Sequence, residues 1–289
     1  QGNELRAGLD GEGDVAVQLR LAGRVDVDSA GHRRGHRQED TGIPQDRQDE
    51  TLRGGDEGRA SGAGGDDAHP FDTGAWRAPG NNTNTFARES HIDIMAAKVK
   101  MDPVEFRLKN FVDKRMIRVL KAAAEKFGWT GAKAPSGCGF GVACGTDVGT
   151  YVATMAEVEV DKKTGQVQPK RVVCAQDMGL VVNPEGAKIQ IEGCITMGLG
   201  YALTEDVHFN GGKILDLNFA TYKLPRFSQV PEIETVLIDA KDNPAQGGGE
   251  PAIIVMGAVM ANAIYDATGA RVLQLPMTPE RIKEAMPKT

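Results

Sequence analysis

The first quarter of the chain is short of the residues from which a protein core is built. Residues 1–68 contain no Phe, Trp, Tyr, Cys, Met or Lys, but about nine Arg and about fourteen Gly. A segment with so little apolar surface cannot offset the conformational entropy lost on ordering. Alternating apolar residues within 15–27 are its one hint of a strand. We therefore expect no packed domain before the segment that begins near Phe71.

Three interpretations of residues 1–68 compete. A disordered tail fits the composition, and so does a nucleic-acid-binding arm, although acidic residues outnumber Arg and argue against the arm. The third is that the segment is not the natural reading frame, because Arg, Gly, Asp, His and Gln without Lys or aromatics is typical of GC-rich DNA read out of frame. We favour the out-of-frame interpretation over disorder and assign the segment no function.

Other absences restrict the class of protein. The four cysteines have no Cys-x-x-Cys spacing, so no zinc or iron–sulfur framework follows from them, and we expect reduced, buried thiols. No stretch reaches the roughly 20 apolar residues of a membrane span, and no signal peptide is recognisable. A net charge of −6 argues against general nucleic-acid binding. We expect a cytoplasmic protein, with a periplasmic location as the alternative.

The most informative segment that is present reads Gln-Gly-Gly-Gly-Glu-Pro over residues 246–251, followed by an apolar run with helical spacing. Three glycines let the backbone approach another surface closely. Pro251 suits the first turn of a helix. Glu250 would then be a lone carboxylate at a helix N-terminus, either as an acid or base against a bound cofactor or as a helix cap. The run 252–271 is apolar on nearly every side, which predicts a buried helix.

The rest of the chain alternates helical and strand patterns. Helices are expected over 86–100, over 103–111 after the N-cap Asp102, over 116–127, and from Asn183-Pro184 onward. Residues 154–160 and 167–175 should form a hairpin around a loop at 161–165, and 232–240 a further strand. The glycine-rich residues 137–149 lack the Lys and the helix of a phosphate loop, so we expect a strand pressed against a close neighbour.

Several motifs, in order, resemble one family. They are Arg77-Ala78-Pro79-Gly80, the Asp102-to-Asn110 motif, Gln190-Ile191-Glu192-Gly193 and the Glu250 loop. Over residues 71–286 the chain resembles the large, molybdenum-binding subunit of the xanthine dehydrogenase and aldehyde oxidase family, most closely its isoquinoline-oxidoreductase branch. The resemblance implies an α+β fold, with 71–289 as the C-terminal part of the molybdopterin-binding region. The Asp102-to-Asn110 motif is expected to be structural.

The resemblance also implies roles for single residues. Glu250 would be the catalytic base, and Arg77, Gln190, Gly248 and Gly249 would contact the cofactor, with no metal ligand from the protein. The chain departs from the commoner Arg-Gly-x-Gly at Arg77, which leaves that backbone contact in doubt. Taken alone, Arg77 is also consistent with a surface loop arginine. Gln190 is equally consistent with a helix glutamine bonded to the backbone.

The implied activity is hydroxylation of a carbon in an N-heterocycle or an aldehyde, with oxygen from water. The cofactor would be molybdopterin, in its cytosine dinucleotide form, carrying Mo. The electrons would pass to [2Fe–2S] clusters on a small partner subunit, in some members with a flavin subunit or a cytochrome. The alternative is a truncated, non-catalytic fragment or assembly module that binds no metal alone.

Overall fold

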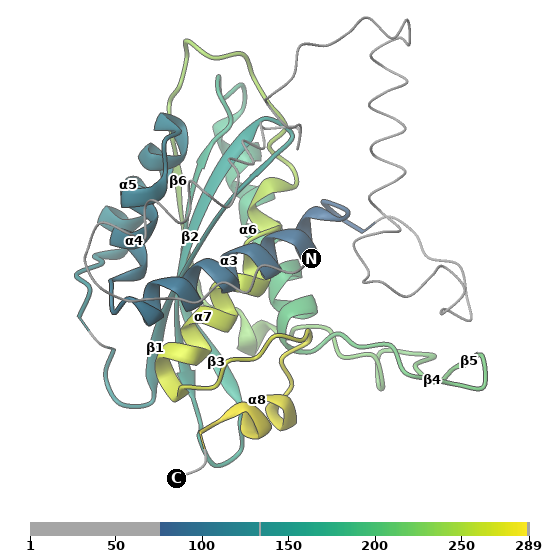
Figure 1. Cartoon of the computed structure of the whole chain (residues 1–289). Coiled ribbons are helices and arrows are strands. Elements are labelled where there is room, and N and C mark those ends of the chain that lie inside the picture. Colours follow the sequence, from purple (N-terminus) through teal and green to yellow (C-terminus); the bar gives the residue numbers. More distant parts are fainter. Residues whose placement is uncertain (1–75, 133, 288–289) are drawn as a thin grey trace, which may run out of the picture.

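The computed structural model describes residues 76–132 and 134–287, so the 1–68 segment and its hint of a strand lie outside it. Within these residues, helices cover both faces of a four-stranded sheet (Figure 1). This arrangement confirms the α+β fold class. The helices are α3 (Asn81–Lys98), α4 (Pro103–Asn110), α5 (Lys114–Phe127), α6 (Pro184–Leu203), α7 (Met256–Thr268) and α8 (Pro279–Ala285).

The sheet has the order β1-β2-β3-β6. Strands β1 (Cys138–Asp147), β2 (Thr150–Val160) and β3 (Val167–Asp177) pair antiparallel, and β6 (Glu232–Leu237) pairs parallel to β3. The predicted hairpin is therefore confirmed. The last strand ends earlier than predicted, because its neighbour β3 stops at Asp177 and the ladder closes with Ile238 N–H donating to the Gln176 carbonyl.

Alternate residues of the strands face opposite layers, as the period of a strand requires. Val142 and Cys144 of β1 pack with α5, whereas Ala143 between them packs with α7. Helix α3 lies across the outer side of α7 (Figure 1). Among the described residues, 251–268 is the one helical stretch long and apolar enough to span a membrane, and 83 % of that stretch is buried inside the fold.

Two glycines let β1 and α7 touch backbone to backbone. A Cβ at Gly139 would lie 2.1 Å from the Ala263 carbonyl oxygen, and one at Gly141 would lie 2.2 Å from the Val259 carbonyl oxygen. No side chain fits at those distances, so the prediction of a glycine-rich strand pressed against a close neighbour is confirmed, and the neighbour is α7.

The predicted helix starts hold for α4, for α6, which begins at Pro184 after the N-cap Asn183, and to within two residues for α5, and they fail for α3 and α7. Asp102 and Asp113 cap α4 and α5 through backbone N–H groups, near the predicted starts. Helix α3 begins at Asn81, not at residue 86 as predicted. Ala78, at φ 55°, turns the chain, and the Asn82 side chain donates to the Arg77 and Ala78 carbonyls. The polar residues 81–85 are therefore the first turn and a half of α3, ahead of the predicted start.

The Asp102-to-Asn110 motif has the structural role expected of it. Arg107 is fully buried on α4, and its Nε donates to the Glu89 carboxylate of α3 at 3.0 Å. The same carboxylate accepts the Cys144 N–H of β1 at 2.8 Å. This one ion pair therefore joins two helices and the sheet.

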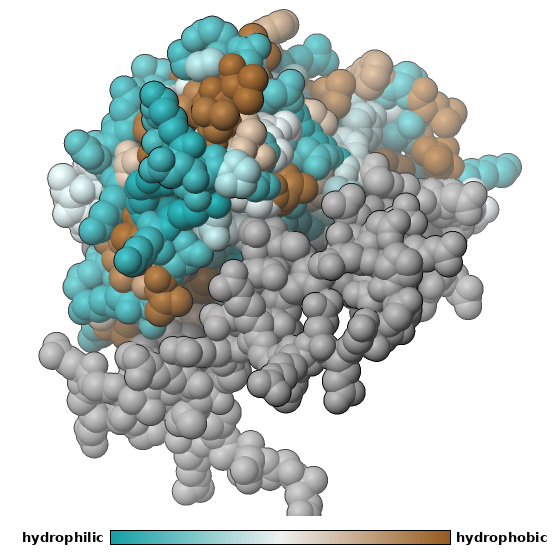
Figure 2. Space-filling model, turned by 90° about the horizontal axis from the view of Figure 1, so that it is seen from above, coloured by the Kyte–Doolittle hydropathy of each residue, from teal (hydrophilic) through white to brown (hydrophobic). Residues whose placement is uncertain are grey.

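Residues 207–227 form an arm that extends from the body and carries the short ladder of β4 (Phe209–Asn210) and β5 (Lys213–Ile214) (Figure 1). Its large apolar side chains stand exposed, and apolar surface appears on that side of the molecule in Figure 2. Exposed apolar patches of this kind mark interaction surfaces. The exposed side chains are Val207, Phe209, Ile214, Leu215, Leu217, Phe219, Leu224 and Phe227.

Candidate functional site

Three segments far apart in the sequence meet at Arg77. Its Nε donates to the Gly249 carbonyl at 2.9 Å, and its Nη2 donates to the same oxygen. Nη2 also donates to Gln190 Oε1 of α6 at 2.8 Å. The guanidinium thus clamps the glycine loop to α6. The structure brings Arg77, Gln190 and Gly249 into direct contact.

The contact with Arg77 also determines how the Gln190 amide is turned. A guanidinium can only donate, so the atom facing it is the amide oxygen. The Gln190 Nε2 donors are left for another partner. Gln190 and Gly248 line a cavity of about 310 Å³ beside the N-terminal end of α6, together with Met178, Asn183, Ala187 and Gln246. This cavity therefore has an amide N–H donor in its wall.

The glycines of the loop differ in how much space each leaves for a side chain. A Cβ at Gly248 would lie 2.3 Å from Met178 Cε, so this position has no room for a side chain. At Gly249 the nearest atom would be Gln190 Oε1 at 3.7 Å, which is ordinary contact. The backbone N–H groups of Gly248 and Gly249 donate to no acceptor within the described residues. Two unpaired donors thus accompany the Gln190 amide.

Glu250 lies directly after these glycines. Its Oε1 accepts the Ala78 N–H at 3.1 Å, and its Oε2 makes no hydrogen bond within the part of the chain described here. The expected position at a helix N-terminus is confirmed, but the helix is a short 3₁₀ turn, Pro251–Ile253, with Glu250 as its N-cap residue and Pro251 at its first position. The Glu250 side chain makes no capping hydrogen bond, and α7 begins only at Met256. The dipole of a long helix therefore does not start at this carboxylate.

Two buried residues near the loop were not predicted as site residues. The Cys194 thiol of α6 lies 3.3 Å from the Gly249 carbonyl oxygen and 3.5 Å from that of Glu250. Burial raises the pKa of Cys194 to about 11, against a lowering by Arg77, so the sulfur stays a thiol donor at neutral pH. Cys194 lies one helical turn after Gln190, which is the sequence signal that could have identified it.

The second residue is Gln176, which is fully buried behind Gly248. Its Oε1 has no partner among the described residues.

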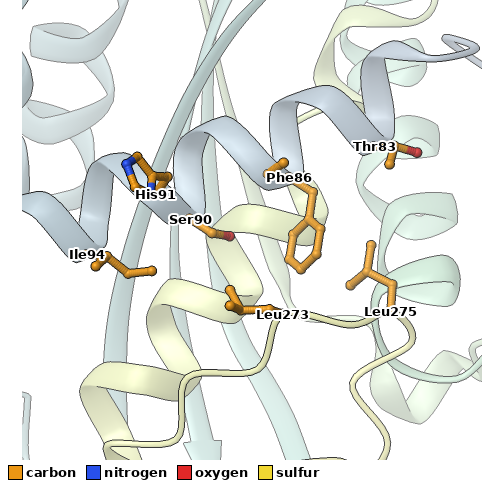
Figure 3. Close-up of a pocket in the computed structure, with 8 residues that line it drawn as sticks. Thr83, Phe86, Ser90, His91, Ile94, Leu273 and Leu275 are labelled. Atoms are coloured by element: carbon orange, nitrogen blue, oxygen red, sulfur yellow. The ribbon is translucent and has the colours of Figure 1, made fainter. Parts of the chain in front are cut away.

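A larger cavity, of about 510 Å³, lies elsewhere (Figure 3). It is bounded by one face of α3 and by the segment before α8. Phe86, Ser90, Leu273 and Leu275 face it, with His91 at its edge. It shares no lining residue with the Arg77–Glu250 region. In the described residues, no group of three or more His, Cys, Asp or Glu side chains could hold a metal ion.

Comparison with known families adds an independent finding. Residues 87–231 match the model of the molybdopterin cofactor-binding domain. The chain is 35 % identical over 237 residues to a subunit of nicotinate dehydrogenase from Pseudomonas putida, covering 76 % of this chain and 20 % of that protein. It is 34 % identical over 197 residues to the beta subunit of isoquinoline 1-oxidoreductase from Brevundimonas diminuta, covering 67 % and 25 %. The chain therefore spans only about a fifth to a quarter of these relatives.

Among solved structures, the fold matches the aldehyde oxidoreductase of Desulfovibrio desulfuricans with a TM-score of 0.65. The match covers 74 % of this chain and 41 % of that one, at 19 % sequence identity. At this identity the likeness concerns the fold alone.

Proposed function

The chain belongs to the family of molybdopterin cofactor-binding domains found in molybdenum-binding subunits of the xanthine dehydrogenase and aldehyde oxidase type, and on this premise we propose that it carries the base of a molybdenum-dependent hydroxylase. Glu250 is that base. The observation that carries the proposal is the contact of Arg77 with Gly249 and Gln190, directly beside the Glu250 carboxylate.

The polar groups beside the loop suit a pterin cofactor. Pterin rings and phosphates offer many acceptors, which match the unpaired N–H groups of Gly248 and Gly249 and the Gln190 amide. The buried Gln176 Oε1 is an acceptor without a donor, and leaving such an atom unpaired costs about 1–3 kcal/mol. When bound, the cofactor supplies the oxidising centre that adds water-derived oxygen to an electron-poor carbon and takes up the electrons.

Glu250 contributes through its two oxygens. The Ala78 N–H holds Oε1 and thereby orients the carboxylate. Oε2 makes no hydrogen bond within the described residues, so it can accept the proton that the attacking oxygen loses. Arg77 binds the loop and brings positive charge close to that carboxylate without pairing with it. We assign Gly248 and Gly249 to cofactor binding through their backbone N–H groups.

The replacement Glu250→Gln tests the role of the base in the assembled enzyme. Loss of a general base lowers kcat on the order of 10²–10⁴-fold. KM should change much less, because the lost interaction belongs mainly to the transition state. Molybdenum content, measured by mass spectrometry, should stay at the wild-type level. The matched control is Glu192→Gln, an exposed position on α6. Near-normal turnover at full molybdenum occupancy would show that Glu250 is not the base.

The alternative function is that of a non-catalytic module. The chain spans 20–25 % of the length of these two relatives, and the alternative concerns this chain purified alone. As an isolated chain it would be a non-catalytic module that binds little or no metal. Mass spectrometry of the purified 289-residue chain measures this directly. Stoichiometric molybdenum would rule out the module and favour a self-sufficient cofactor site.

The finer features of the activity are also part of the proposal. The substrate is an N-heterocycle or an aldehyde, and the cofactor is the cytosine dinucleotide form of molybdopterin. The relatives are named as subunits, which supports assembly with other chains. The partner proposed is a small subunit with [2Fe–2S] clusters, alone or with a flavin subunit or cytochrome, in the cytoplasm. Iron analysis of the purified complex tests that partner.

A further inference from the structure

The helix that follows Glu250 is interrupted without a breaker in its sequence. Residues 251–268 read as one continuous helix, with Pro251 acceptable in its first turn. The β-branched Ile253, Ile254 and Val255 lower helix propensity only slightly. The chain instead forms a 3₁₀ turn at Pro251–Ile253 and starts α7 at Met256. The sequence of the segment gives no cause for this late start, whereas a contact from another element supplies one.

That cause is a hydroxyl group from α6. In a continuous α-helix, the Gly257 N–H would donate to the Ile253 carbonyl four residues earlier. Here Tyr201 Oη donates to the Ile253 carbonyl at 2.9 Å and accepts the Gly257 N–H at 2.9 Å. The hydroxyl takes the place of one bond of the helix. A side chain inserted into the helical ladder is a known cause of breaks.

The surroundings of Tyr201 support this insertion. A Cβ at residue 257 would lie 3.3 Å from Tyr201 Cε2, so glycine there lets the ring approach. Burial raises the pKa of Tyr201, against a lowering by the Gly257 N–H, so the group remains a hydroxyl that can donate and accept at once. Both backbone groups at the break are therefore satisfied.

We propose that Tyr201 is a positioning residue for Glu250, because its hydroxyl keeps Pro251–Ile253 out of α7 and so holds the Glu250 carboxylate against Ala78. A 3₁₀ turn rotates about 20° more and rises about 0.5 Å more per residue than an α-helix. Rewinding residues 251–253 would therefore turn Glu250 by roughly 60° and move it by about 1.5 Å. The bond from Ala78 N–H to Glu250 Oε1 would not survive that movement. The inference rests on the proposed function only for its catalytic consequence.

The full chain is sufficient for the structural test. Tyr201→Phe keeps the ring and removes the hydroxyl, and Tyr222→Phe is the matched control, because it removes a hydroxyl bonded to Glu205. By NMR, the Tyr201 variant should shift the Cα resonances of residues 251–255 toward α-helical values. Because the Ala78 amide donates to Glu250, Glu250→Gln should shift the Ala78 amide resonance in the wild type and in the control, and not in Tyr201→Phe. An Ala78 amide that still responds to Glu250→Gln in the Tyr201→Phe background would overturn the proposal, including the case in which a water replaces the hydroxyl.

The catalytic test uses the assembled enzyme. Misplacement of a reacting group by about 1 Å costs on the order of 10²-fold in rate, so Tyr201→Phe should lower kcat about 10–100-fold with KM nearly unchanged. Tyr222→Phe should leave both constants near wild type. If Glu250→Gln is fully active while the NMR result holds, the proposed function fails and the role of Tyr201 in the fold stands. If Glu250→Gln is inactive and Tyr201→Phe is normal, the inference fails alone.

Discussion

Two arginines hold the two ends of the segment that carries α3, and they do so in opposite ways. Arg107 is sealed in the core: its guanidinium donates to the Glu89 carboxylate and to the carbonyls of Pro103, Glu89 and Val142. Arg77 is half-buried, and it donates to the Gly249 carbonyl, the Gln190 amide and the Met197 sulfur. No described carboxylate lies within ion-pair distance of Arg77, although Glu250 follows the carbonyl it binds.

The difference separates a structural charge from a charge available for function. At Arg107 the positive and negative groups neutralise each other, which is what burial requires. At Arg77 the cation and the nearby carboxylate each bond to neutral groups of the protein. Their charges thus remain available to a ligand. The comparison explains why two arginine motifs, which look equivalent in the sequence, have different roles.

The largest effect should come from breaking the buried pair of Arg107 and Glu89. Removing one partner of a buried ion pair costs about 3–5 kcal/mol, because the other charge is left buried without compensation. Arg107→Met should lower the free energy of unfolding by that amount in urea denaturation. Lys109→Met, at a side chain that is 57 % exposed and pairs with the equally exposed Glu105, is the control and should cost less than about 1 kcal/mol. Equal losses of unfolding free energy at both positions would show that the buried pair stabilises the fold no more than an exposed one does.

A smaller effect is expected at Arg77. Arg77→Lys keeps the charge and loses the planar fork that binds Gly249 and Gln190 together. The free energy of unfolding should fall by only about 1 kcal/mol, the net contribution of one or two hydrogen bonds. The loop 247–250 should become more mobile, which hydrogen exchange would detect as faster exchange confined to that segment. A loss as large as that of Arg107→Met would mean that Arg77 is structural too.

The smallest effect tests whether there is space beside Arg77. A Cβ at Gly193 would lie 3.6 Å from Arg77 Nη1, which is ordinary contact. Gly193→Ala should therefore raise the stability by about 0.5–1 kcal/mol through helix propensity. In the same helix, Gly198→Ala is the control, because its Cβ would lie 2.4 Å from Met256 Cγ and should lower the thermal midpoint. A destabilised Gly193→Ala would show that the surroundings of Arg77 are closely packed.

The sequence predicts what depends on local patterns. The cap at Asp102 and the alternation around 161–165 lie within a few residues of the elements they define, and these elements are confirmed. The predicted start of α7 is wrong, because the hydroxyl that bonds to its first turn belongs to Tyr201, which lies 52 residues from Ile253 and 56 from Gly257 in the sequence. No periodicity within residues 251–268 carries that information.

The candidate site was predicted from motifs, and its assembly depends on packing. Arg77 is 113 residues from Gln190 and 172 residues from Gly249, so their contact could not be derived from spacing. The roles of these residues and of Glu250 remain predictions. Cys194 was interpreted only as a buried thiol, because its hydrogen bonds go to backbone carbonyls that only the folded loop presents.

The glycine contacts between β1 and α7 depend on a match between the repeat of the strand and the repeat of the helix. Two residues of strand advance about 6.6–6.8 Å and four residues of helix about 6.0 Å, so the two repeats coincide over one step and then drift apart. Gly139 and Gly141 face the carbonyls of Ala263 and Val259, four residues apart, while Gly145 already faces the Ile254 side chain. These two contacts therefore fix how far α7 can slide along β1. Because Glu250 lies just before α7, its position along the strand depends on the absence of side chains at Gly139 and Gly141, although its carboxylate makes no described hydrogen bond to β1.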